Sequence, residues 1–139
     1  MSRKQEASAR FGDDLFESTP AEQFCIDALE GLDRGTGWTF DRAQVDTRFS
    51  ARADLAPHTL SDCLHELEYW DRLYKMRAAV DGVGDPAAES TERERFTFRR
   101  LAHTRAKTKD EAIAVFRYLS DSDHMDDTET NDIFFNLIG

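Results

Sequence analysis

Two stretches of alternating apolar and polar residues, separated by a loop, restrict the fold of this chain more than any other feature. In residues 73–80 apolar side chains alternate with basic ones, and in residues 93–101 Phe96 and Phe98 would share one face of a strand. Alternation with a period of two is typical of half-buried β-strands. Residues 81–92 between them are rich in Gly, Pro and acid, so the pattern predicts a β-hairpin.

Other segments carry helix signals. Thr19 and Glu22 match a capping box with Pro20 at the first helical position, and Thr108 with Glu111 matches a second. Apolar residues recur at helical spacing behind both. We therefore expect helices that begin near Thr19, Asp41, Pro57 and Thr108, and a last short helix that includes Ile133 to Ile138.

Three helices followed by a basic hairpin is the element order of a winged helix-turn-helix. The predicted fold class is therefore α+β, mostly α, with additional C-terminal helices for dimerisation. The predicted organisation is an N-terminal arm over residues 1–17, a winged-helix domain over 18–105 and the C-terminal helices over 106–139.

The charge of the chain is acidic overall but uneven. Its 18 basic and 28 acidic residues give a net charge of −10, and only four of the basic residues are lysines. Few lysines and many aspartates are typical of proteins that stay hydrated at molar salt, so we expect a halophile and bound potassium or other ions. An ordinary acidic protein is the alternative. Residues 72–109 reverse the balance, with ten basic and five acidic residues, as a DNA footprint would.

The predicted domain would read DNA with the helix that starts near Pro57 and hold phosphates with the hairpin. Asp62 and Glu66 on that helix would repel phosphate, so part of its face is expected to point away. The candidate base contacts are His58, Thr59, Ser61 and His65; the candidate phosphate contacts are Lys75, Arg77, Arg93 and Arg95, with Arg48 and Arg52 as weaker ones. Surface residues without a DNA role are the alternative for each.

These segments resemble a known family. Residues 56–67 with Leu73-Tyr74-Lys75 resemble the recognition helix and first wing strand of PadR-like transcription regulators, and residues 95–101 resemble the second wing strand. Residues 37–40 also match a family motif, and with the acidic composition the chain is most similar to haloarchaeal members. The resemblance implies a sequence-specific, stress-responsive DNA-binding regulator that dimerises through its C-terminal helices.

The C-terminal helices carry more apolar surface than one narrow stripe can bury, because Phe134 and Phe135 are adjacent. A homodimer through these helices is therefore expected. The candidate interface residues are Val115, Phe116, Leu119, Ile133, Phe134, Leu137 and Ile138. A protein-interaction module of the same fold, without DNA binding, is the alternative function.

Other classes of function find little support in the sequence. It has no nucleotide-binding, hydrolase or metal-ligand motif, so we expect neither an enzyme nor a cofactor or metal. Cys25 and Cys63 fall on apolar helix faces, which favours inert core residues over redox sensors. Without a long apolar run or a secretory leader, a cytoplasmic location is expected.

Overall fold

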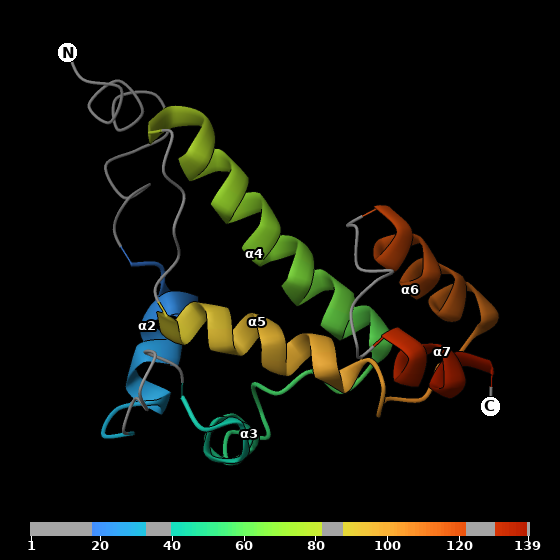
Figure 1. Ribbon diagram of the computed structural model, residues 1–139, viewed down its shortest axis with the longest axis horizontal. Helices are drawn as coiled ribbons and strands as arrows, with labels where there is room; N and C mark the ends of the chain where they lie inside the picture. Colours follow the sequence, from blue (N-terminus) through green and yellow to red (C-terminus); the bar gives the residue numbers. More distant parts are fainter. Residues whose placement is uncertain (1–17, 33–39, 82–87, 122–129, 139) are drawn as a thin grey trace.

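The structure, a computed structural model, describes residues 18–32, 40–81, 88–121 and 130–138, and in these segments it is helical (Figure 1). The helices are α2 (Pro20–Ala28), α3 (Arg42–Ser50), α4 (Leu60–Asp81), α5 (Ala88–Arg100), α6 (Lys109–Asp121) and α7 (Thr130–Ile138).

The predicted hairpin is wrong. Residues 73–80 continue α4, and residues 93–100 belong to α5, so neither predicted wing strand exists. No strand occurs in the described segments, which excludes the predicted α+β class and the winged helix within them. The part of the PadR-like match at residues 37–39 lies outside the described residues, as does the predicted arm over 1–17.

The alternation in α5 misleads because four of its six buried positions are polar. Ser90, Arg93 and Thr97 are buried at spacings of three and four residues, which is one face of a helix. A hydrophobic pattern cannot reveal a face that is lined by an arginine and two hydroxyls. The chain instead pairs this face with an acidic residue of α4, because Glu66 accepts hydrogen bonds from Arg93 and Thr97.

The alternation in the second half of α4 reflects exposure. Tyr74 and Met76 are exposed although they are large and apolar. Figure 1 shows why: α4 is the longest helix, and its C-terminal end projects beyond α2 and α5. Apart from Arg77, which pairs with Glu22 of α2, the last turns contact little of the described protein, so the alternation there does not indicate a buried apolar face.

Two hydrophobic clusters hold the helices together. The first joins α2, α3, α4 and α5 through Cys25, Leu29, Phe40, Val45, Phe49, Trp70 and Phe96. The second joins the start of α4 and the end of α5 to α6 and α7 through Leu60, Cys63, Leu64, Leu67, Phe98, Leu101, Val115, Leu119 and Ile133. Because α4 and α5 contribute to both clusters, they form the spine of the molecule.

The sequence signals for helix starts hold well. The capping box of Thr19 and Glu22 is complete, with 3.2 Å from the Glu22 amide to Thr19 Oγ1 and 2.9 Å back from the Thr19 amide to Glu22 Oε1. Asp41 caps α3. At α6 only half of the predicted box forms: Thr108 accepts from the Glu111 amide, while the Glu111 carboxylate binds elsewhere.

Candidate nucleic-acid interface

The predicted base-reading residues mostly serve the protein itself. His58 Nε2 lies 2.8 Å from the Ala53 carbonyl oxygen, and Thr59 Oγ1 accepts from the Asp62 amide at 3.0 Å. Ser61 Oγ donates to Glu111 at 2.7 Å. These side chains fix the start of α4 and its junction with α6. Only His65 is exposed on this face without such a contact in the described segments.

Two of the predicted phosphate contacts are internal ion pairs. Arg77 donates to both oxygens of Glu22, at 2.9 and 2.8 Å, and its side chain is 12% exposed. Arg93 donates to both oxygens of Glu66 and to the Leu55 carbonyl, and its side chain is 4% exposed. Neither guanidinium is available to a phosphate, because both lie inside the helix packing.

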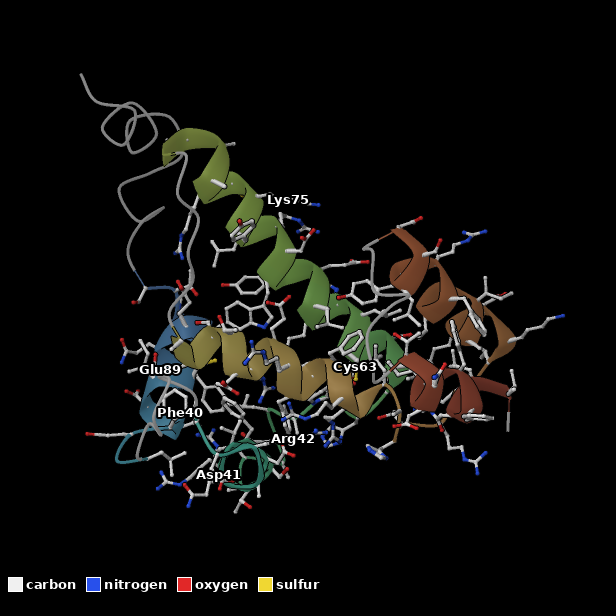
Figure 2. The ribbon with its side chains drawn as sticks, in the orientation of Figure 1. Phe40, Asp41, Arg42, Cys63, Lys75 and Glu89 are labelled. Carbon is white, nitrogen blue, oxygen red and sulfur yellow. The ribbon has the colours of Figure 1, made fainter. Side chains whose placement is uncertain are left out.

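The other predicted phosphate contacts are scattered. Arg48 donates to the carbonyl oxygens of Ala28 and Glu30 at the end of α2. Arg52, Lys75 and Arg95 are exposed, and each forms a surface ion pair with a neighbour on its own segment. Lys75 lies on the projecting part of α4, well away from Cys63 in the first turns of the same helix (Figure 2). The structure does not bring these residues together with the start of α4.

A different basic surface lies between α5 and α6. Residues 99–109 contain five Lys and Arg residues and no acidic residue. Through the turn the chain alternates in burial: Ala102, Thr104 and Ala106 are partly buried. The exposed positions up to residue 109 are His103, Arg105, Lys107, Thr108 and Lys109. We call residues 103–109 the basic loop.

The basic loop has its cations free. Neither Arg105, Lys107 nor Lys109 forms an ion pair within the described part of the chain, although 28 acidic residues are available in the sequence. Three unpaired cations close in sequence repel one another, and nearby acids would relieve that repulsion. Asp110 follows the loop directly and is also exposed. The loop thus concentrates positive charge that forms no ion pair with the described residues.

Hydrogen bonds from three sides hold the basic loop in place. Asn136 of α7 donates from Nδ2 to the carbonyl oxygens of Leu101 and Thr104, at 2.9 and 2.7 Å. On the other side, Arg100 Nε donates to the Pro57 carbonyl at 3.2 Å, which ties the end of α5 to the start of α4. The loop is therefore a fixed surface next to the N-terminus of α4.

Glu111 makes the third connection. It accepts from the Lys107 amide at 2.8 Å and from the amide and hydroxyl of Ser61. Burial opposes its ionisation, but these hydrogen bonds outweigh burial and hold the pKa of Glu111 below its ordinary value. Glu111 therefore stays charged while it joins the loop to α4.

Sequence reasoning placed Arg105, Lys107 and Lys109 in the basic region but not among the contacts. The sequence signal that points to these cations is the absence of any acidic residue from residue 99 to residue 109. Four of the predicted phosphate contacts lie instead on the predicted wing strands, and these segments are helices in the structure.

The cysteines are structural in this arrangement. Cys25 and Cys63 are free and buried. Burial raises the pKa of each thiol to about 12, so neither forms appreciable thiolate near neutral pH. The reading as inert core residues is the one that these surroundings favour.

The residues expected at the dimer interface divide into two groups. Val115, Leu119 and Ile133 are fully buried in the second cluster, so they cannot also meet another subunit. Phe116 stacks on Phe134 with ring centroids 5.1 Å apart. The exposed apolar side chains of α6 and α7 are Ile113, Phe116, Phe135 and Ile138, the last two 71% and 74% exposed.

Comparison of the chain with models of known protein families, with curated proteins and with solved structures gives no match. None of the described helices is both long and apolar enough to cross a membrane. The described segments also contain no group of three or more His, Cys, Asp or Glu residues that could hold a metal ion.

Proposed function

We propose that this protein binds double-stranded DNA through the basic loop and acts in the cytoplasm as a transcription regulator. The observation that carries the proposal is the row of exposed, unpaired cations at Arg105, Lys107 and Lys109 in a chain of net charge −10. Lys and Arg side chains of this kind neutralise backbone phosphates. None of the three forms an ion pair with a described residue, and among them only Lys107 acts within the fold, where its charge helps to lower the pKa of Glu111.

The position of the loop adds a means of reading bases. Its anchors at Pro57 and Ser61 place it beside the first turn of α4. A helix whose N-terminal turn lies next to phosphate-binding cations can be directed toward the major groove. In this arrangement His65 is the candidate base contact, because its side chain is exposed on the same helix.

The test is a titration of a labelled random duplex, followed by fluorescence anisotropy. Replacing Arg105, Lys107 and Lys109 together by Gln should weaken binding by at least about tenfold, equal to ~1.4 kcal/mol. The matched control replaces three exposed cations elsewhere by Gln, so that both variants have the same net charge. These are Arg72, Lys75 and Arg117. Equal losses in the two variants would mean that binding follows net charge and would contradict the proposal.

A homodimer completes the proposal. Phe135 and Ile138 on α7, with Ile113 and Phe116 on α6, leave large apolar side chains in water. A second copy would cover them and would present two basic loops to one duplex, as two-fold symmetric readers do. As part of the same proposal, the protein comes from a halophile, and potassium ions bind between its acidic surface and the DNA.

The same apolar side chains favour a second candidate function, a protein-interaction module that does not bind DNA. The two candidates differ in the titration above. An interaction module would leave the duplex unbound at every concentration, whatever the state of the basic loop.

A further inference from the structure

A large cavity lies at the N-terminal part of α4, and its lining includes Pro57, to which Arg100 is tied, and His65. It has a volume of about 830 Å³ and is bounded by α2, residues 54–58, α4 and the Arg93 side chain of α5. Its deep part includes Cys25, Trp70 and Arg93, which are all buried. A cavity of this size holds a drug-sized molecule.

The walls of the cavity are mainly apolar and aromatic. Phe24 of α2 and Tyr69 and Trp70 of α4 are among the lining residues, and Tyr69 packs edge-on against Trp70 with centroids 4.9 Å apart. The Tyr69 hydroxyl is occupied, because it donates to Thr19 Oγ1 at 2.8 Å. The aromatic walls therefore offer ring faces and one polar group, Trp70 Nε1, which is buried without a hydrogen-bond partner in the described segments.

Among the described lining residues Arg93 is the only Lys or Arg; Glu66 balances its charge, while its Nη1 is buried without a hydrogen-bond partner in the described segments. Glu66 binds it through both oxygens. Its guanidinium carbon also lies 4.9 Å from the ring centroid of Phe49, 5.1 Å from that of Phe96 and 5.6 Å from that of Phe24. An anionic ligand would find no free positive charge here.

Asp62 gives the rim of the cavity a negative charge. Its Oδ2 accepts from the amides of His58 and Thr59, both at 3.2 Å, and these hydrogen bonds hold its pKa below the ordinary value. The other lining carboxylates, Asp54 and Glu66, are paired with arginines. Asp62 is the lining carboxylate with no Lys or Arg partner in the described segments.

We propose that this cavity binds a bulky lipophilic cation. The apolar body of the ligand would lie against Phe24, Tyr69 and Trp70, and its positive charge would lie near Asp62. Aromatic faces attract cations through their quadrupoles, and a carboxylate at the rim adds Coulomb attraction. None of the basic-loop cations lines this cavity, so ligand binding can be tested without DNA and whether or not the chain binds DNA.

Two probes of the same size and opposite charge test the proposal: tetraphenylphosphonium and tetraphenylborate. Trp70 reports occupancy by its fluorescence in the Trp38→Phe variant, in which it is the only tryptophan. The buffer contains sodium chloride, because potassium precipitates the borate. We expect the phosphonium to bind at least about tenfold more tightly than the borate.

A pair of charge variants locates the site. Asp62→Asn should weaken phosphonium binding by roughly three- to tenfold, because it removes the rim charge and keeps a capping side chain. Asp71→Asn removes the same charge from an exposed position of α4 outside this cavity and should leave binding unchanged. Calorimetric titration of the chain with Trp38 intact gives the same affinities if the Trp38→Phe variant does not fold.

Three results would overturn the proposal. The borate could bind as tightly as the phosphonium, neither ion could bind, or the two Asn variants could weaken binding equally. The first would mean that the cavity selects only for apolar bulk, and the last that the cation responds to the net charge of the protein.

Discussion

Arg93 and Arg95 show how much about half a helical turn changes the role of a residue. They are two positions apart in α5, yet the Arg93 side chain is 4% exposed and that of Arg95 is 59% exposed. Arg93 binds Glu66 and lies over three phenylalanine rings, whereas Arg95 has one surface contact at 3.4 Å with Glu92. In a strand both would face the same side, so the alternating pattern predicts phosphate contact for both.

The first prediction contrasts these two arginines. Arg93→Ala should lower the free energy of unfolding by about 3–5 kcal/mol, because the largely buried Glu66 carboxylate loses its arginine partner. Arg95→Ala should change it by about 0.5 kcal/mol or less, as exposed pairs contribute little. Urea unfolding at one fixed salt concentration measures both. Similar small effects would show that Arg93 is not in the interior.

At the scale of elements, local signals predicted where helices begin but not how the second half of α4 and α5 continue. The capping residues Thr19 and Asp41 sit at observed helix starts, and the helices expected from Thr108 and around Ile133 are α6 and α7. Capping depends on a few neighbouring residues, so it can be read locally. The faces of α4 and α5 depend on tertiary partners such as Glu66, which the local pattern does not contain.

For the same reason, the sequence predicts only part of the candidate site. The concentration of positive charge after Arg72 is visible in the sequence, but which cations are free depends on the acids that the fold brings near them. Glu22 and Glu66 come from distant segments to pair with Arg77 and Arg93. The cations of the basic loop remain because no such partner reaches them in the described segments.

The second prediction concerns α7. Phe135→Glu should convert the proposed dimer to a monomer, because it places a charge where two apolar faces would meet. Tyr74→Glu is the matched control, since Tyr74 is also a large exposed apolar residue, 47% exposed, but lies on the projecting end of α4. Light scattering should give twice the 15.9 kDa chain mass for the wild type and the control, and once that mass for Phe135→Glu. A monomeric wild type at tens of micromolar would rule out the dimer.

At the scale of the whole molecule, a small cationic surface acts within a strongly acidic protein. Three phosphate contacts alone would give a log–log dependence of affinity on salt with a slope of about −2.7 per subunit. The acidic surface opposes this at low salt by repelling DNA, and potassium taken up between acids and phosphates works against counterion release. As salt rises, counterion release lowers the affinity, whereas screening of the acidic surface and potassium uptake raise it.

The third prediction is therefore a shallow salt dependence. Between roughly 0.5 and 2 M KCl the slope for one duplex should lie closer to zero than about −2.7 per subunit, and it can become positive. Circular dichroism at each point checks that the protein remains folded. A steeper loss of affinity in the folded protein would leave the acidic composition as a feature of solubility alone.

The most direct test of the account is to map the DNA-binding surface by nuclear magnetic resonance. Amide shifts of the labelled protein would be followed while a duplex is added. If the basic loop binds DNA, the largest changes fall in residues 103–109 and in the adjoining turn at Pro57 to Ser61, with little change at Arg77 or Arg93, which are paired inside the protein. Changes centred on the projecting end of α4, or no changes at all on saturating DNA, would contradict the account.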